Sequence, residues 1–201
     1  MQPGADVPDR ELILPTRPII EIDTPRLRLR QWRPSDVVPF AAMNADPRVM
    51  AFFPEPMRPP ESRAMARHIR DLIEARGWGL WAVEVRGGAR FIGFVGLHVP
   101  PPEVPCAPCV EIGWRLAHEH WGHGYATEAA RAVLEVGFER LRLDEIVSFT
   151  AAANLRSQAV MHRLGMRRES ASFDHPSIPP GHPLREHVLY RLRREDWERG
   201  A

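Results

Sequence analysis

The sequence contains no lysine, so all 27 of its basic Lys-or-Arg positions are arginine. This absence excludes a Walker-type phosphate-binding lysine, a Schiff-base lysine and a lysine general base within the 201 residues. The 26 acidic residues leave a formal net charge of +1. That balance argues against a strongly basic nucleic-acid-binding protein and against an acidic, solvating chain, so we expect no nucleic-acid partner.

Cysteines are few and long apolar runs are absent. Cys106 and Cys109 are the two cysteines, too few for a disulfide framework. No stretch of 18 apolar residues occurs, and residues 1–20 lack the cationic start and apolar core of a signal peptide. These features predict a protein of the reducing cytoplasm that does not enter a membrane.

Length and patterning predict one domain that follows an irregular start. A chain of 201 residues fits a single domain, and a hydrophobic content of 44% supplies a sizeable core. Residues 1–23 are rich in proline and charge without periodicity, and we expect them to form a flexible extension. Residues 24–201 are regular and form the predicted domain.

Strand-like and helical patterns follow one another from residue 24 onward. Strands are predicted over 26–32, 80–85, 91–99, 110–116, 145–152, 166–173 and 187–193. Helices are predicted over 34–45, 59–76 and 155–164, and from a glycine turn at 122–124 to about 141. Hairpins mixed with crossover helices predict an α/β fold with a mixed, twisted sheet of about six or seven strands, flanked by helices.

The glycine turn is the strongest local signal. Gly122 and Gly124 flank His123 between a predicted strand and a helix, where backbone N–H groups and the helix dipole suit a phosphate or pyrophosphate. The alternative is a tight turn that needs positive φ and binds nothing. A dinucleotide site is disfavoured, because Thr127 replaces the third glycine of GxGxxG and the preceding strands are predicted to form hairpins instead of opening a βαβ unit.

Two other clusters have features of metal sites. Cys106 and Cys109 have the spacing of half a zinc site or a redox pair, but no second pair exists and nearby prolines favour an ordinary loop. His118, His120 and His123 fail the HExxH pattern, because a glycine stands where the second histidine is required. We therefore expect no metal.

Three segments together resemble a known family. IGWRL and WGHGYATEA, followed thirty residues later by NLRSQAVMHRLGM, resemble the GNAT superfamily of acyl-CoA-dependent N-acetyltransferases. The nearest branch is the RimJ/RimL-like one, whose namesakes acetylate the N-termini of ribosomal proteins. The resemblance covers residues 24–197, including TPRLRLRQW and HVLYRL. It implies acetyl-CoA as acyl donor and a sheet splayed between its fourth and fifth predicted strands, at 110–116 and 145–152.

The resemblance assigns the donor to the glycine turn and the strand before it. Glu119 departs from the family's Q/R-x-x-G-x-G/A pattern, and we expect its carboxylate to point away from the pyrophosphate. The backbone of Leu116 is implied to bind the pantetheine arm like an added strand, and a backbone N–H of its strand to polarise the thioester carbonyl. The pyrophosphate falls to the backbone of Gly122, His123, Gly124, Tyr125 and Ala126.

Catalytic roles are implied for a serine and a glutamate. Ser157 matches the serine proposed to protonate the coenzyme A sulfur in RimL-like enzymes, and Asn154 is placed with the donor-binding residues. The alternative is an N-cap followed by a small residue of the first helical turn. Glu111 stands where some members carry a catalytic glutamate, and the alternative is a solvated side chain. A water relay suffices for a peptide α-amine with a pKa near 8.

The acceptor is expected to be a primary amine of a peptide N-terminus or a small molecule. The resemblance implies that two segments border the acceptor site: the one between the first two helices and the loop between the last two strands. Phe53, Asp174 and His175 are therefore candidate acceptor-binding residues. Phe52 and Trp81 are either core or further walls. The sequence predicts acetyl transfer by direct attack, in a monomer or homodimer. Alternatives are a non-catalytic acyl-CoA sensor and a dinucleotide-binding oxidoreductase.

Overall fold

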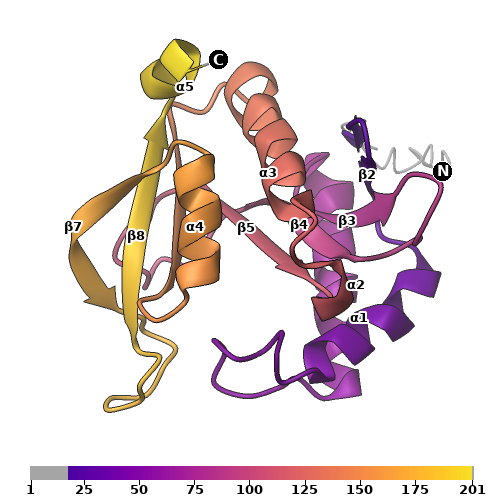
Figure 1. The fold of residues 1–201 in the computed structure, drawn as a ribbon, viewed down its shortest axis with the longest axis horizontal. Coiled ribbons are helices and arrows are strands. Elements are labelled where there is room, and N and C mark those ends of the chain that lie inside the picture. The colour runs from indigo at the N-terminus through magenta and orange to yellow at the C-terminus, as the bar shows by residue number, and fades with distance from the viewer. Residues whose placement is uncertain (1–17, 201) are drawn as a thin grey trace, which may run out of the picture.

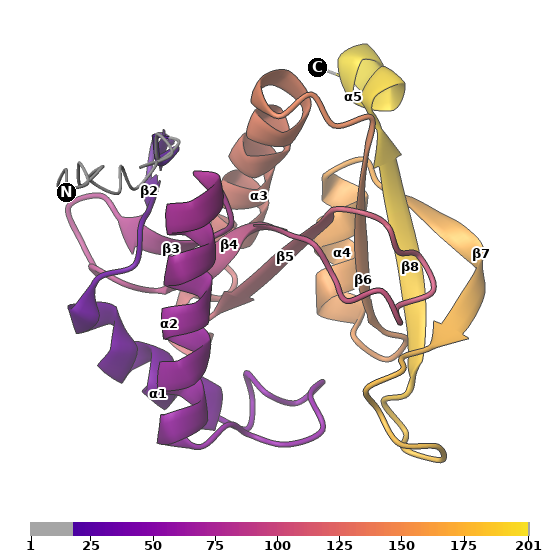
Figure 2. The same cartoon turned by 180° about the vertical axis from the view of Figure 1, so that it is seen from behind.

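The computed structural model, which describes residues 18–200, contains an open eight-stranded sheet with helices on both faces (Figures 1 and 2). The strand order is β1-β2-β3-β4-β5-β6-β8-β7. All neighbouring strands are antiparallel except β5 and β6, which are parallel. This arrangement confirms the predicted mixed α/β fold, with one strand more than expected.

The element boundaries follow the sequence signals closely. The strands are β1 (Ile22–Asp23), β2 (Leu27–Arg30), β3 (Leu80–Val85), β4 (Gly93–His98), β5 (Glu111–Leu116), β6 (Glu145–Ala151), β7 (Arg167–Asp174) and β8 (Glu186–Arg193). The helices are α1 (Val37–Ala45), α2 (Pro59–Arg76), α3 (Tyr125–Glu135), α4 (Leu155–Arg163) and α5 (Arg194–Gly200). Short 3-10 turns occupy Pro34–Asp36 and His118–His120, and a π-helical turn at Val136–Arg140 extends α3.

The sheet begins before residue 24. β1 pairs with Arg28 and Leu29 of β2, and the Ile20 N–H donates to the Gly77 carbonyl at 2.8 Å. The expected flexible extension over 1–23 therefore includes at least four residues, 20–23, that contact the folded protein. Residues 1–17 lie outside the described residues, so the expectation that they form a flexible extension stays a prediction.

The helices divide between the two faces of the sheet. In Figure 1, α3 and α4 lie in front of the sheet. Figure 2 shows the opposite face, where α1 and α2 lie in front of it. Apolar side chains fill the space beneath both layers. Trp81 is fully buried there, and its indole Nε1 donates to the Ile20 carbonyl at 2.6 Å. Trp81 is thus a core residue and does not form a wall of a site.

β5 and β6 meet at only one point. Their single register pair is Glu111 with Val147, next to a bond from the Val147 N–H to the Val110 carbonyl at 2.9 Å. Beyond it the strands separate, which confirms the predicted splay. Because α3 connects these parallel strands, the glycine turn does lie in a βαβ unit, so the expectation that it follows only hairpin strands is wrong.

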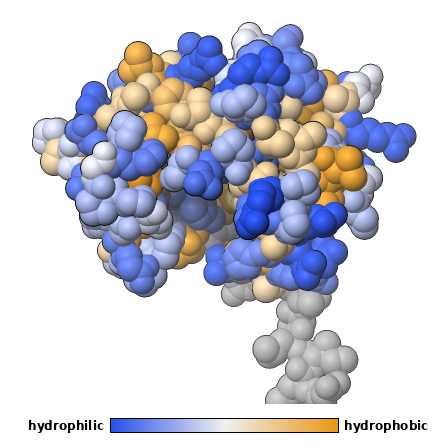
Figure 3. Space-filling view, turned by 90° about the horizontal axis from the view of Figure 1, so that it is seen from below, coloured by the Kyte–Doolittle hydropathy of each residue, from blue (hydrophilic) through white to orange (hydrophobic). Residues whose placement is uncertain are grey.

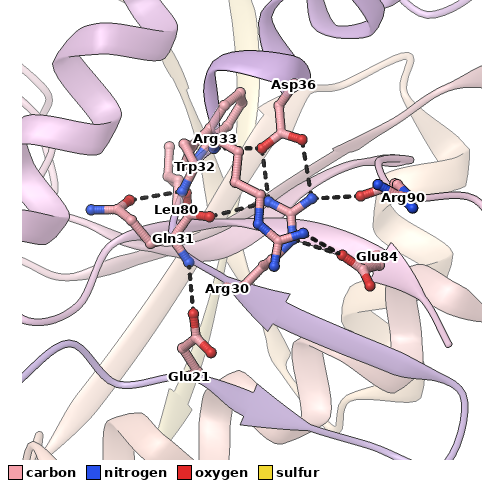
Figure 4. Close-up of polar contacts among 9 residues, drawn as sticks. All are labelled: Glu21, Arg30, Gln31, Trp32, Arg33, Asp36, Leu80, Glu84 and Arg90. Atoms are coloured by element: carbon pink, nitrogen blue, oxygen red, sulfur yellow. Dashed lines mark hydrogen bonds and ion pairs between the residues drawn. The ribbon is translucent and has the colours of Figure 1, made fainter.

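A buried ionic network holds the end of β2 (Figure 4). Arg30 is 1% exposed and bonds both carboxylate oxygens of Asp36, at 2.7 and 3.0 Å, and Glu84 at 2.8 Å. Its remaining donors reach the carbonyls of Gln31 and Arg90. All five N–H groups of this guanidinium are matched by acceptors, as burial of a charge requires.

Candidate active site

A large cleft opens where β5 and β6 separate. Its volume is about 2220 Å³, and its lining includes residues of α2, β5, β6 and the first turns of α3 and α4. Figure 3 shows a hollow in the face seen from below, between the half with β7 and β8 and the half with α1 and α2. The splay therefore creates a passage that reaches both faces of the sheet.

The N-terminus of α3 lines one part of this cleft. Gly124 is its N-cap, with φ of +79° and no side-chain cap, and the first helical bond runs from the Glu128 N–H to the Gly124 carbonyl at 3.0 Å. The N–H groups of Tyr125, Ala126 and Thr127 make no hydrogen bond within residues 18–200. Three unpaired amides and the helix dipole make this end a site for an anion.

The glycine turn is held in place by the N-terminal segment. Arg26 donates to the His123 carbonyl at 2.9 Å and to Glu128 at 2.6 Å, and Thr24 donates to the same carboxylate at 2.6 Å. Burial raises the pKa of Glu128, but the bonds from Thr24 and Arg26 outweigh it and hold the pKa below its ordinary value. This anchor depends on contacts between distant segments, so the sequence did not indicate it.

Two side chains of this segment stay outside the cleft. The His123 ring stacks on Tyr125, with centroids 5.5 Å apart, and its Nδ1 lies 2.9 Å from the Trp121 carbonyl. His123 is exposed and contributes no side chain to the lining. Glu119 is also exposed and outside the lining. Leu116 does line the cleft, and its carbonyl accepts from Trp121 Nε1 at 2.8 Å, which leaves one lone pair.

Asn154 and Ser157 line the cleft at the start of α4. Asn154 Oδ1 accepts from the Ser157 N–H at 3.2 Å, so Asn154 is the N-cap that the sequence allowed. Its Nδ2 donates to Thr150 Oγ1 at 2.9 Å and to Ser157 Oγ at 3.1 Å. Because the serine oxygen accepts from Asn154, its own hydrogen is left to be donated into the cleft.

Glu111 lies at the point where the two strands part. It is 7% exposed, lines the cleft, and accepts from His98 Nε2 at 2.8 Å and from the Phe149 N–H. Burial raises the pKa of the Glu111 carboxyl above its ordinary value, although these bonds oppose the rise. Burial lowers the pKa of His98, but Glu111 more than compensates and raises it. The solvated alternative for Glu111 is therefore wrong.

His98 is a functional candidate that sequence reasoning missed. Its place beside Glu111 depends on the register of β4 with β5, which pairs these two residues across a connection of twelve residues, 99–110. No local motif marks such a pair. Its side chain is 34% exposed, so it connects the buried carboxylate to solvent.

The three candidate acceptor residues do not come together. Phe53 lines the cleft with its ring 4.1 Å from the Arg115 guanidinium. His175 lines it from the β7–β8 connection, with its ring 4.8 Å from that of His187, and burial lowers the pKa of both histidines. Asp174 does not line the cleft, and its carboxylate pairs with Arg185 at 2.8 Å.

The structure also locates the two cysteines and the other possible metal ligands. Cys106 and Cys109 are free thiols whose sulfurs lie 3.4 Å apart. Within residues 18–200 no group of three or more His, Cys, Asp or Glu side chains is placed to hold a metal ion. None of the helices in that range is long and apolar enough to span a bilayer.

Comparison with known proteins gives consistent matches. Residues 26–167 match a family model described as an acetyltransferase (GNAT) domain. The chain is 34% identical over 127 residues to the FsC-acetyl coenzyme A-N(2)-transacetylase of Aspergillus fumigatus, covering 61% of this chain and 53%, about half, of that relative. An acetyltransferase structure from Agrobacterium tumefaciens has a TM-score of 0.71 at 28% identity, covering 87% of this chain and 95% of that one.

A more distant solved structure shares the fold. RimL, a ribosomal L7/L12 α-N-protein acetyltransferase in complex with coenzyme A, has a TM-score of 0.69 at 16% identity. The superposition covers 87% of this chain and 98% of RimL. At this identity the match shows a shared fold.

Proposed function

The chain belongs to the GNAT acetyltransferase family, and on this premise we propose that it transfers the acetyl group of acetyl-CoA to a primary amine by direct attack. One observation carries the proposal. A buried carboxylate, Glu111, lies in the same cleft as Ser157 and the unpaired amides of α3. That cleft follows the break between β5 and β6, where strand edges are open to a third extended segment.

The donor fits the cleft on two grounds. The unpaired amides of the first turn of α3 suit a pyrophosphate, and the strand edges near Leu116 suit the amide-bearing pantetheine arm. Acetyl-CoA supplies an activated acetyl thioester when bound. Gly113 adds room in the middle of β5, because a Cβ built there meets nothing within 4 Å.

Glu111 is proposed as the general base. Nucleophilic attack requires a neutral amine, so an ammonium group of the acceptor must first lose a proton. A carboxylate whose pKa is raised by burial binds a proton more strongly than an exposed one. His98 bonds the same carboxylate and is partly exposed, and it is proposed to pass the proton on to solvent.

Ser157 is proposed as the proton donor to the leaving sulfur. As the nitrogen–carbon bond forms, the carbon–sulfur bond breaks and its electron pair stays on sulfur, which takes the hydroxyl proton; water then reprotonates the serine. Neither tyrosine among the described residues serves instead. Tyr190 is buried and bonded to Gln158 and His162, and Tyr125 stacks between His123 and Arg26. These groups favour an enzyme over a non-catalytic sensor.

The acceptor is proposed to be a peptide N-terminus or a small-molecule amine. The name of RimL describes a protein substrate, and that of another structural neighbour, the spermidine N-acetyltransferase of Vibrio cholerae, describes a small-molecule amine, so both kinds of acceptor occur among proteins of this fold. Of the three acceptor-binding candidates from the sequence, Phe53 and His175 line the cleft. The proposed acceptor region lies beside these two residues.

The donor site is tested with Gly124→Asp. Asp adds a negative charge and a side chain where a pyrophosphate must approach the backbone, so acetyl-CoA binding measured by calorimetry is expected to be lost. Gly87→Asp is the matched control, since Gly87 has φ of +73° and open space but lies in the β3–β4 turn outside the cleft. Unchanged affinity in folded Gly124→Asp would refute the pyrophosphate site.

The reaction itself is tested by thiol release from acetyl-CoA across a panel of amines. Acetyl-CoA is expected to raise the melting temperature, since a ligand that binds only the native state stabilises it. Thiol release is expected with at least one amine class. Binding of acetyl-CoA without thiol release from any amine would favour the sensor, and preferential binding of NAD would favour the oxidoreductase.

A further inference from the structure

Arg115 lies on the same face of β5 as the proposed base. Alternate residues of a strand share a face, so Glu111, Gly113 and Arg115 follow one another along one side of β5. This is the side of α1 and of the segment between α1 and α2, since Arg115 contacts Asn44 and Met57 there. All three residues of β5 line the cleft.

The guanidinium of Arg115 is held only by uncharged groups. Its Nη1 donates to Asn44 Oδ1 at 2.7 Å and lies 3.7 Å from Met57 Sδ. The rings of Phe53 and Phe94 lie 4.1 and 5.5 Å from its central carbon. These contacts fix the position of the positive charge without neutralising it.

Asn44 is itself fixed in one orientation. Asn44 is fully buried, and so is Ser62, whose hydroxyl accepts from Asn44 Nδ2 at 3.1 Å. The amide oxygen of Asn44 is therefore directed at Arg115. Two hydrogen bonds between uncharged groups of α2 and α1 and the Arg115 side chain thus fix the position of the guanidinium at the cleft.

The positive charge of Arg115 has no counter-ion among the described residues. Within residues 18–200, no carboxylate lies within 4.0 Å of the guanidinium nitrogens of Arg115. Its Nε is buried with no hydrogen-bond partner, and Nη2, which is not fully buried, makes no bond to the described residues either. Burial lowers the pKa of Arg115 to about 10, so the group stays charged at neutral pH.

An unpaired cation in a substrate cleft is a site for an anion. Arginine prefers carboxylates, whose charge it matches with a charge-assisted hydrogen bond. The open space over Gly113 separates this cation from Glu111. Four residues of strand span about 13 Å between α-carbons, and both long side chains extend into the cleft.

We propose that Arg115 binds a carboxylate of the acceptor, so that the acceptor is an amine that also carries a carboxylate group. Its amine lies at Glu111 and its carboxylate at Arg115, with the chain between them over Gly113. This inference rests on the proposed function and narrows its acceptor class. It also disfavours polyamines, because a second ammonium group placed at Arg115 meets a like charge.

The test uses pairs of amines that differ only in the carboxylate. The probes are ω-amino acids from glycine to 6-aminohexanoate and a set of dipeptides, each with its carboxamide, and ω-aminoalkylphosphonates form a third arm. For at least one chain length, the wild-type kcat/KM is expected to be about 10- to 100-fold higher for the carboxylate than for the carboxamide. No preference in any pair, or a preference for the phosphonate, would overturn the proposal.

Variants assign the preference to Arg115. In Arg115→Gln the ratio of kcat/KM for the carboxylate to that for the carboxamide is expected to fall to about one, mainly through a higher KM for the carboxylate. Arg115→Lys is expected to retain part of this preference. Arg63→Gln is the control, since it removes the same charge from an exposed position of α2 outside the cleft. Equal losses on carboxylates and carboxamides in Arg115→Gln would show a structural role and refute the assignment.

Binding separates this proposal from the proposed function. Calorimetry with the same carboxylate probes on the protein saturated with free coenzyme A requires no turnover. If no amine is acetylated, yet a carboxylate binds the wild type and not Arg115→Gln, the acetyl-transfer proposal fails and the carboxylate site stands. If no carboxylate binds and none is acetylated, the site assignment is refuted.

Discussion

Arg30 and Arg115 both extend from the sheet into the protein, but their surroundings differ. Arg30 satisfies all five N–H groups with two carboxylates and two carbonyls, whereas Arg115 has one amide oxygen and no acid beside it within the described residues. Burial lowers the pKa of both, but bonds to Asp36 and Glu84 raise that of Arg30 overall. The comparison therefore distinguishes Arg30, whose charge stabilises the fold, from Arg115, whose charge is free to bind a ligand.

The same division holds for the regions around them. Near Arg30, donors and acceptors are matched within the protein (Figure 4), whereas the cleft holds free amides at α3, a buried carboxylate and an available hydroxyl. Substitutions in the first region are therefore expected to change stability, and those in the cleft to change activity.

The largest expected effect is on stability, from Arg30→Gln. It leaves Asp36 and Glu84 without their buried partner, and breaking such pairs costs about 3–5 kcal/mol. Urea unfolding measures the loss. Arg33→Gln is the control: its bond to Glu84, at 3.2 Å, comes from a side chain that is 49% exposed, so we expect less than about 1 kcal/mol. Equal effects of the two variants would remove the contrast between the regions.

Ser157→Ala is expected to lower kcat by roughly 10²–10³-fold. Acetyl-CoA affinity should change little, because the hydroxyl acts in the transition state, and stability should also change little, because Asn154 keeps its bond to Thr150. The loss is expected to be larger at pH 7 than at pH 9, where a thiolate leaves without a proton. Leu155→Ala, in the same helical turn and 71% exposed, is the control. Wild-type kcat at both pH values would make Ser157 structural.

Glu111→Gln is expected to lower kcat by about 10²-fold, at the lower end of the range for a general base. The wild-type kcat should fall with decreasing pH as Glu111 becomes protonated, at a pH above the ordinary pKa of a glutamate because burial raises its pKa. This acidic limb should be absent in Glu111→Gln. If the limb persists, the base is a water relay or another group such as His175.

The smallest expected effect is that of Arg115→Gln on stability. Removing a buried charge that has no counter-ion relieves its desolvation, and the shorter amide can still donate to Asn44. The free energy of unfolding should stay within about 1 kcal/mol of the wild type, in contrast to Arg30→Gln. A loss above about 2 kcal/mol, measured under the same urea conditions, would assign Arg115 to the stabilising region.

Local signals predicted most of the fold. Pro59 at its start and Gly77 after its end delimit α2 at the boundaries that the structure has, since Pro fits a first helical turn and Gly the left-handed cap, here with φ of +80°. The helix predicted to run to about residue 141 does end near there, at Arg140, but the π-turn in its last part was not predictable. Gly137 packs so close to Ile146 that a Cβ would lie 2.5 Å from its Cδ1, and the helix there has a π-turn. The two-residue β1 is too short for any periodicity.

The positions of the proposed site residues in the cleft were predictable where these residues lie in motifs, and not where they depend on strand register. The glycine turn lies in the segment WGHGYATEA, and Asn154 and Ser157 lie in the later segment NLRSQAVMHRLGM. Glu111 belongs to the strand before the glycine turn. The roles proposed for His98 and Arg115 depend on other elements of the fold. His98 bonds the Glu111 carboxylate on the neighbouring strand, and Arg115 has no acid beside it among the described residues. In a chain whose 27 cationic side chains are all arginine, nothing in the sequence singled out Arg115.

The arginine ion pairs have a chemical consequence if the protein uses an activated thioester, as proposed. Among the described residues, every ion pair takes its cation from arginine except that of His98 with Glu111. A guanidinium stays protonated at neutral pH and is a poor nucleophile, whereas the ε-amine of lysine accepts acyl groups. No side chain in the sequence carries a primary amine. The side chains therefore offer their own donor no amine to modify, and the charges that stabilise the fold are protected from self-acetylation.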